Sequence, residues 1–259
     1  MTVKKDILIS VKNLKKEFRT GETSQTIFEN LTLTVYKGDF TVIMGASRAG
    51  KSTLMYSLSG MDRPTEGSIL FSDKEITKYN DDELAVFRRK KCGFVFQQIY
   101  LLDKMSLMDN VLTAGALCNN NKKEVIQRVK ELFELVNIPD ITQKKFSTQV
   151  FGGEAQRAGI VRAVINNPAV IFADEPTGAL NSNNPEAALN VFTKLHREGQ
   201  SIIMVTHDKK TALRGNSILY IKDGRIFGDC CLENYSEADK EREKQYWYHL
   251  QARCFIMFC

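Results

Sequence analysis

Residues 45–52 have the spacing G-x-x-x-x-G-K-[ST], which constrains the fold of this chain more than any other segment. They follow a short apolar stretch, residues 40–44, that predicts a strand, and they precede a helix expected over residues 51–60. In such a loop, successive backbone N–H groups surround phosphates, and the helix N-terminus adds the positive end of its dipole. The pattern therefore predicts a site for nucleotide phosphates, with Lys51 reaching the β- and γ-phosphates and Ser52 binding Mg²⁺.

A second candidate element is an apolar strand, residues 170–173, that ends in two acidic residues, Asp174 and Glu175. Ligands of parallel sheets bind at the carboxyl ends of the strands. We therefore expect Asp174 to hold Mg²⁺ through water, and Glu175 to polarise or position the attacking water as a general base. Alone, an acid pair at this position equally fits a turn or a helix cap, but together with a phosphate loop it favours nucleotide hydrolysis.

The remaining patterns predict an α/β core with a helical insertion in its middle. Apolar and polar residues alternate over residues 7–35, which predicts antiparallel strands. Residues 79–154 have mostly helical periodicity, apart from a strand signal at residues 93–96. Strands and helices then alternate again, and Asp223-Gly224 predicts a hairpin near the end of this region.

Composition excludes several other classes of protein. With 259 residues, 43% of them hydrophobic and 26% charged, the chain has enough apolar material for a core, so intrinsic disorder is not expected. No unbroken apolar run approaches the roughly twenty residues that a membrane-spanning helix needs, and no secretory signal is visible. The net charge of +5 is ordinary, and the six cysteines lack metal-binding spacings, which indicates reduced thiols.

Five motifs, in their order along the chain, resemble those of the ATPase subunits of ABC transporters. They are residues 45–52, Gln97 in G-F-V-F-Q, residues 152–157 (G-G-E-A-Q-R), residues 173–178 (A-D-E-P-T-G) and residues 206–208 (T-H-D). The pattern is most similar to the bacterial branch that serves macrolide export, lipoprotein release, and bacitracin or lantibiotic resistance.

The resemblance extends over about residues 7–229 and implies a fold as well as an activity. The implied fold is α/β: a P-loop NTPase core with an N-terminal antiparallel β subdomain and an inserted α-helical subdomain. The expected domain organisation is an ABC ATPase domain over residues 1–229, with a helical lobe inserted at about residues 98–153. Residues 230–259 do not resemble the family and are expected to form a divergent, helical tail.

The resemblance also implies that two copies form a head-to-tail homodimer enclosing two ATP molecules. The phosphate loop of one copy then faces the start of the helix at Gly152 and Gly153 in the other copy. The residues expected to bind ATP are Phe18, Gly45, Ala46, Ser47, Arg48, Ala49, Gly50, Lys51, Ser52 and Thr53. The residues expected to face ATP across the dimer are Phe151, Gly152, Gly153 and Glu154.

For the reaction, the resemblance implies catalytic residues and residues that hold Mg²⁺. The expected catalytic residues are Glu175, His207 and Gln97, and the expected Mg²⁺ residues are Ser52, Gln97 and Asp174. His207 would contact the γ-phosphate and fix the attacking water. Phe18 would stack on adenine, although simple strand packing also explains a phenylalanine there.

The partners that the resemblance implies are a second copy and an integral-membrane permease subunit, and no nucleic acid. The chain would be peripheral, at the cytoplasmic face of the plasma membrane, and would power export of an antimicrobial peptide, a lipid-linked compound or a similar amphiphile. A soluble, non-transport ABC ATPase is the alternative from another class, but such proteins carry a long coiled coil or two tandem cassettes, which this sequence lacks.

Three positions depart from the family pattern. Arg48 stands where the family usually has glycine, and a positive φ there would cost an arginine about 1–2 kcal/mol. Phe151 stands at the signature serine, whose hydroxyl bonds the γ-phosphate across the dimer, and Asn181 replaces an aspartate. ATP binding should survive these changes, but a catalytically weak, regulatory ATP-binding subunit becomes the alternative reading.

Overall fold

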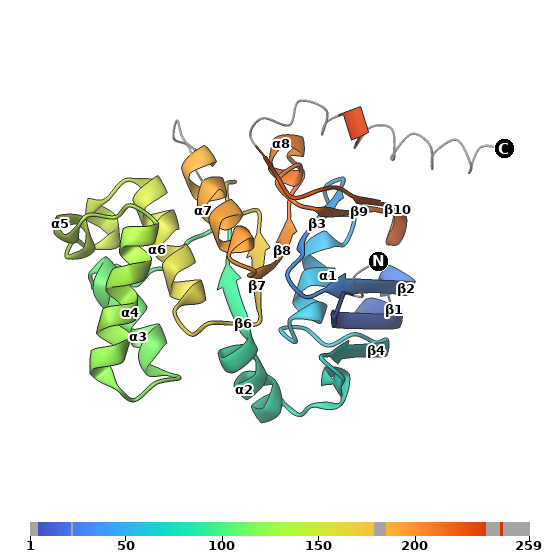
Figure 1. Ribbon diagram of the computed structural model, residues 1–259. Coiled ribbons are helices and arrows are strands. Elements are labelled where there is room, and N and C mark those ends of the chain that lie inside the picture. The colour runs from blue at the N-terminus through green and yellow to red at the C-terminus, as the bar shows by residue number, and fades with distance from the viewer. Residues whose placement is uncertain (1–4, 22, 179–184, 237–243, 246–259) are drawn as a thin grey trace. The chain divides into compact units, whose positions relative to one another are not determined.

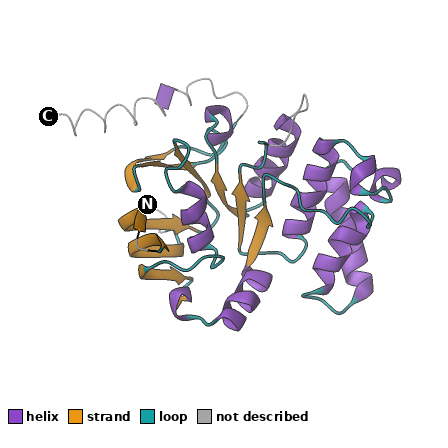
Figure 2. Cartoon of the chain, turned by 180° about the vertical axis from the view of Figure 1, so that it is seen from behind, coloured by secondary structure: helices purple, strands orange, loops and turns teal. Residues whose placement is uncertain are grey.

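The computed structural model describes residues 5–21, 23–178, 185–236 and 244–245, and the chain divides into two compact units (Figure 1). Unit 1 combines residues 1–84 with residues 199–259, and unit 2 consists of residues 85–198. Coloured by secondary structure, strands predominate in unit 1 and helices in unit 2 (Figure 2).

Unit 1 contains a four-stranded antiparallel sheet with the strand order β2-β1-β4-β5. Its strands are β1 (Ile7–Thr20), β2 (Thr23–Tyr36), β4 (Glu66–Phe71) and β5 (Lys74–Glu75). Alternate residues such as Val11, Leu33 and Val35 are buried, because successive side chains of a strand point to opposite faces. The alternation in the sequence thus predicted these antiparallel strands correctly.

The second strand layer of unit 1 has the order β10-β9-β3-β8. Its strands are β3 (Phe40–Gly45), β8 (Ser201–Val205), β9 (Ser217–Lys222) and β10 (Arg225–Cys231). β3 pairs in parallel with both β8 and β9, and every residue of β3 and β8 is buried, which explains their continuous apolar sequences. The hairpin between β9 and β10 turns at Asp223 and Gly224, with φ values of 49° and 71°, as the sequence predicted.

The helices of unit 1 are short. They are α1 (Lys51–Leu58), the 3₁₀ turn η1 (Ile76–Lys78) and α8 (Lys209–Ala212), and α2 (Asp81–Lys91) crosses from unit 1 into unit 2. α1 begins directly after the phosphate loop and buries Leu54, Met55 and Leu58. The predicted order of strand, loop and helix around residues 45–52 is therefore confirmed.

Unit 2 consists of a parallel strand pair and a set of helices. The strands are β6 (Cys92–Val95) and β7 (Val170–Asp174). The helices are α3 (Leu107–Ala116), α4 (Lys122–Leu135), α5 (Asp140–Gln143), η2 (Ser147–Gln149), α6 (Gly152–Val164) and α7 (Pro185–Arg197). Side-chain oxygens of Ser106 and Asn121 cap α3 and α4, and α4 buries an apolar stripe, so the helical prediction for residues 79–154 is confirmed.

The end of the chain is described only in part. β10 runs to Cys231, so it includes the first two residues of the expected tail, and the Leu232 N–H donates to the carbonyl of Asn216 at 2.8 Å. Of the helix expected in the tail, only residues 244–245 are described, and Asn181 also lies outside the described residues. In the part of the chain that the structure describes, no helix has the length and apolar character to cross a membrane.

Candidate nucleotide site

Two glycines allow the phosphate loop its conformation. Gly45 has a φ of 155°, and a Cβ at this position would lie 2.1 Å from the carbonyl oxygen of Ile221. Gly50 has a φ of 89°, and a Cβ there would lie 2.8 Å from the Cγ2 atom of Ile27. Larger residues would therefore force the loop away from β9 and β2, so the two fixed glycines of the motif have a steric reason in this structure.

Lys51 lies inside the loop that precedes it. Its side chain is buried, and its Nζ donates to the carbonyl oxygens of Gly45 at 2.9 Å and Ala46 at 2.8 Å. Gly50 is the N-cap of α1 and provides no side-chain cap, and no acidic residue lies in the first turn. The loop thus combines a positioned ammonium group with a helix N-terminus that has no anionic side chain, which is the chemistry that phosphates require.

Arg48 lies at the exposed part of the same loop with a φ of 66°. The sequence predicts a cost for arginine at position 48 if φ there is positive, and the structure shows that φ is positive. The Cβ of an L-residue is unfavourable in this region, where glycine is not. Arg48 therefore occupies a position whose backbone conformation favours glycine.

Replacing Arg48 with glycine should relieve this strain. We expect Arg48→Gly to be about 1 kcal/mol more stable to unfolding than Arg48→Ala, because both remove the guanidinium but only glycine removes the Cβ. Urea denaturation of the two variants measures the difference. Equal stabilities would show that the left-handed conformation at this position carries no cost.

His207 is at the same edge of the unit 1 sheet as the phosphate loop. β3 and β8 are parallel, with Ile43 opposite Val205, so their carboxyl ends lie side by side. The phosphate loop follows β3, and Thr206 and His207 follow β8. The side chain of His207 is exposed. Figure 1 shows the strands β3 and β8 in unit 1. Parallel pairing thus brings together two groups that are far apart in the sequence.

The backbone that carries His207 is fixed by its neighbours. The Asp208 N–H donates to the Thr206 hydroxyl at 3.1 Å, and Asp208 caps α8 by accepting from the Thr211 N–H at 2.7 Å. Burial opposes the charged form of Asp208, but the hydrogen bonds from Thr211 and Lys210 outweigh it and lower the pKa of this carboxyl. A carboxylate therefore follows His207 and holds the turn in place.

Phe18 lies on β1 with 46% of its surface exposed, so it is not a buried packing residue. The ammonium group of Lys16 lies 4.7 Å from the centre of its ring. Lys16 is itself held by Asp62 at 2.6 Å and by the carbonyl of Arg63 at 2.7 Å. β1 therefore presents a half-exposed ring beside a fixed cation, and the sequence did not indicate Lys16 as part of this arrangement.

Unit 2 brings Gln97 and the two acidic residues to one edge of its strand pair. β6 and β7 are parallel, with Val95 opposite Ala173, so Gln97, Asp174 and Glu175 all lie at carboxyl ends. A Cβ at Gly178 would lie 2.9 Å from Nε2 of Gln97 and 3.3 Å from the carbonyl oxygen of Glu175. The amide of Gln97 therefore packs against the turn that begins at Glu175, which has a φ of 45°.

Phe151 is the N-cap residue of α6, and 83% of its surface is exposed. Glu154 reaches back, so its Oε2 accepts from the Phe151 N–H at 3.1 Å, while the Glu154 N–H donates to the Phe151 carbonyl at 2.9 Å. A phenyl ring has no acceptor for the helix N–H groups, so the reciprocal half of a capping box is missing. Backbone bonds fix the position of Phe151 and leave its ring in solvent.

Further along α6, a buried hydrogen bond links the helix to the turn that carries the acidic residues. Nε2 of Gln156 donates to the carbonyl oxygen of Pro176 at 2.6 Å. Gly152, Gly153 and Glu154 form the first turn of α6, as the motif at residues 152–157 requires. Gln156 belongs to the motif at residues 152–157, but only the structure shows that it connects α6 to the turn after β7.

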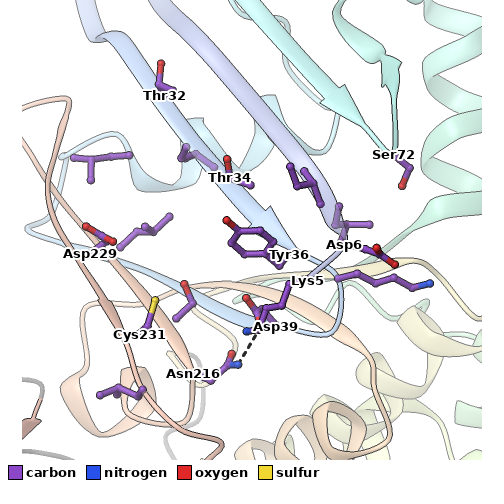
Figure 3. Close-up of a pocket in the computed structure, with 18 of the residues that line it drawn as sticks. Lys5, Asp6, Thr32, Thr34, Tyr36, Asp39, Ser72, Asn216, Asp229 and Cys231 are labelled. Atoms are coloured by element: carbon purple, nitrogen blue, oxygen red, sulfur yellow. Dashed lines mark hydrogen bonds and ion pairs between the residues drawn. The ribbon is translucent and has the colours of Figure 1, made fainter. Parts of the chain in front are cut away.

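Figure 3 shows a pocket of about 1350 Å³ in unit 1, whose lining includes none of the site residues described above. Asp39, just before β3, and Asn216, just before β9, line it, and Oδ1 of Asp39 accepts from Asn216 at 3.1 Å and from Lys5 at 2.6 Å. It is therefore at the amino ends of β3 and β9, opposite to the edge where the phosphate loop begins. Ligands of parallel sheets bind at carboxyl ends, so this pocket is not the nucleotide site.

A phosphate loop between a buried parallel strand and a helix, with further polar residues at parallel strand ends, defines a P-loop NTPase fold with an added helical part. The profile of the ABC transporter family matches residues 28–178, and the chain belongs to this family.

Several curated proteins are similar to most of the chain. The chain is 39% identical over 222 residues to the macrolide export ATP-binding/permease protein MacB of Aggregatibacter actinomycetemcomitans, covering 86% of this chain and 34% of that protein. It is 39% identical to the ABC transporter ATP-binding protein YvrO of Bacillus subtilis and 38% identical to the lipoprotein-releasing system ATP-binding protein LolD of Aquifex aeolicus, covering 96% and 97% of those proteins. The chain thus spans about a third of the length of the MacB relatives it matches and nearly all of YvrO and LolD.

Two solved structures have the same fold. One is the dimeric ABC transporter cassette MJ0796, with a TM-score of 0.80 and 34% identity, covering 88% of this chain and all of that chain. The other is the same cassette in a dimeric post-hydrolysis state with ADP and phosphate, with a TM-score of 0.80 and 33% identity.

Proposed function

We propose that this chain binds and hydrolyses ATP as a homodimer and thereby powers a membrane ABC transporter. The observation that carries the proposal is the phosphate loop of unit 1, in which Lys51 is buried against the carbonyls of Gly45 and Ala46 and His207 lies at the same sheet edge. Nucleotide-bound and dimeric relatives of the same fold support ATP as the ligand and two copies as the working assembly.

The residues present fit Mg²⁺ and ATP by their chemistry. Mg²⁺ takes oxygen ligands, and Ser52, Asp174 and Gln97 offer a hydroxyl, a carboxylate and an amide oxygen. The half-exposed ring of Phe18 offers a stacking face for adenine, and the loop from Gly45 to Ser52, with Thr53 after it, faces the phosphates. Bound Mg²⁺ neutralises phosphate charge, and the protein positions everything else.

Hydrolysis then needs one base and two positioning groups. Glu175 accepts a proton from water as its oxygen attacks the γ-phosphorus, and the bond from that phosphorus to the β–γ bridging oxygen breaks to leave ADP and phosphate. His207 contacts the γ-phosphate and Gln97 orients the water. The signature segment of the second copy, residues 151–154, covers the γ-phosphate with the backbone N–H groups of Gly152 and Gly153.

The transport partner is an integral-membrane permease, which places this chain peripherally at the cytoplasmic face of the plasma membrane. The names of the MacB and LolD relatives refer to macrolide export and lipoprotein release. These names support the proposal that the exported substrate is an antimicrobial peptide, a lipid-linked compound or a similar amphiphile. The helical lobe receives the permease, and Tyr100 and Leu102, which are 63% and 58% exposed in unit 2, offer apolar contacts.

The direct test measures ATP binding and ATPase activity of the purified chain, alone and with its permease in lipid vesicles. Saturable ATP binding and a turnover that rises with the permease are expected. If the chain binds no ATP, the proposal is wrong. If the ATPase rate is the same with and without the permease, the soluble, non-transport class of ABC ATPase is favoured.

A second candidate function is a catalytically weak regulatory subunit of the same kind of transporter. The observation that favours it is the ring of Phe151 at the start of α6, where the family has a serine hydroxyl. In a homodimer this change affects both ATP sites.

Restoring the hydroxyl separates the two functions. Phe151→Ser should raise steady-state ATPase activity at least several-fold, because a hydrogen bond to a charged phosphate contributes about 1.5–3 kcal/mol, or about 10- to 150-fold if it acts in the transition state. ATP affinity of the monomer should hardly change. Phe151→Ala is the matched control, since it removes the ring without adding the hydroxyl. If the parent already turns over as fast as Phe151→Ser, the weak-ATPase function is excluded.

A further inference from the structure

Arg48 and Phe151 are two exposed side chains of complementary chemistry. Arg48 presents a guanidinium group from the phosphate loop of unit 1, and Phe151 presents a phenyl ring from the start of α6 in unit 2. Within the part of the chain that the structure describes, neither the guanidinium nor the ring has a hydrogen bond, ion pair or ring contact. Both side chains are thus available to a partner molecule.

The backbone holds each of these side chains at a fixed place. Arg48 has a φ of 66° in a loop whose glycines fit closely against β9 and β2. Phe151 is held by its carbonyl and its N–H, which bond to the N–H and the carboxylate of Glu154 at 2.9 and 3.1 Å. Because 83% of the surface of Phe151 is exposed, its ring buries little apolar area against its own chain.

We infer that the guanidinium of Arg48 stacks on the Phe151 ring of a second copy of this chain when the ATP-bound dimer closes. The inference rests on the proposed function, in which the phosphate loop of one copy faces the start of α6 in the other. Two-fold symmetry then forms the same contact twice, once at each ATP. A cation over an aromatic face is attractive, and arginine forms this contact more often than lysine.

The geometry of arginine lets one side chain serve two neighbours. Its planar guanidinium stacks by its face on the ring, which leaves the five N–H donors in its plane for the phosphates of the bound ATP. The pair therefore joins the two copies at the position where the family's serine hydroxyl is missing. It strengthens the closed dimer rather than the chemical step, so it is compatible with slow turnover.

A double-mutant cycle measures the contact. In the Glu175→Gln background, where hydrolysis is blocked, sedimentation with saturating ATP gives the dissociation constant of the dimer. Arg48→Ala, which keeps the backbone strain, and Phe151→Leu, which keeps an apolar side chain, should each weaken the dimer about 3- to 30-fold. The double variant should be no weaker than either single variant, and Phe151→Tyr should retain the parent affinity.

Mixing tests whether the contact joins two copies. Neither the Arg48→Ala homodimer nor the Phe151→Leu homodimer contains an intact pair. A mixed dimer contains one, because the Arg48 of one copy meets the Phe151 of the other. An equimolar mixture should therefore form more dimer than either variant alone at the same total concentration. Thermal unfolding of each variant shows that it is folded, and saturating ATP keeps a change in the ATP affinity of the Arg48→Ala monomer from being read as a loss of the contact.

Two results would overturn the inference, and they are distinguishable. If the Glu175→Gln chain dimerises with ATP but the two substitutions are additive and mixing gives no gain, the pair is absent while the proposed function stands. That result, with weaker ATP binding in Arg48→Ala monomers, would assign Arg48 to the phosphates of its own site. If the chain stays monomeric with ATP, the pair and the proposed dimer both fail.

Discussion

Replacing Lys51 with alanine should lower the affinity of the chain for ATP by about 10- to 150-fold. The β- and γ-phosphates lose a charge-assisted partner, and such an interaction contributes about 1.5–3 kcal/mol. The Nζ of Lys51 already lies 2.8–2.9 Å from two carbonyls of the loop, so the ammonium group is positioned before ATP binds. Titration of the monomeric chain with ATP measures the loss.

The controls address the loop itself. Lys51 is buried, and its removal takes a donor from Gly45 and Ala46, so the variant must be shown to be folded by its thermal unfolding. Lys51→Met keeps the apolar stem and should lose affinity equally. Lys37→Ala removes an exposed lysine at the opposite edge of the unit 1 sheet and should bind ATP like the parent. Unchanged affinity in Lys51→Ala and Lys51→Met would remove Lys51 from the nucleotide site.

The sequence predicted the local parts of the fold because they depend on local chemistry. The phosphate loop needs Gly45 and Gly50 at set positions, and the structure gives both glycines steric reasons to be there. The alternation over residues 7–35 depends only on the period of a strand. The hairpin at Asp223 and Gly224 depends only on two residues that tolerate positive φ.

Long-range pairing could not be predicted in this way. Residues 40–44 were expected to form a strand, and strands were expected to return after the helical region, but nothing in the sequences of β3 and β8 says that Ile43 lies opposite Val205. That pairing is what places His207 beside the phosphate loop. The packing of Gln97 against Gly178 likewise depends on the register of β6 and β7.

Side-chain exposure was the other missing quantity. Phe18 fitted both adenine stacking and strand packing, and its half-exposed ring beside Lys16 supports the first. At Phe151 the sequence indicated only a lost hydroxyl. The structure shows in addition that the phenyl ring of Phe151 is exposed. The replacement of serine by phenylalanine therefore removes a hydroxyl and also adds an apolar surface that a second copy can contact.

Replacing Glu175 with glutamine should leave ATP binding intact and lower the ATPase rate by at least about 100-fold. An amide is a poor base, and general-base catalysis contributes about 10²- to 10⁴-fold. Glutamine has nearly the same shape and can keep the left-handed backbone of Glu175, whose φ is 45°. With ATP bound and not consumed, the closed dimer should accumulate and elute at twice the mass of the monomer in gel filtration.

The matched control is Glu198→Gln, which changes an exposed glutamate just after α7 in the same unit and should hydrolyse ATP at the parent rate. Binding and turnover are measured on the same preparation, so that a loss of ATP affinity is not mistaken for a loss of the base. A Glu175→Gln chain that hydrolyses ATP as fast as the parent would mean that another group activates the water. His207, at the end of β8, would then be the next residue to substitute, because it is the other titratable side chain assigned to the reaction.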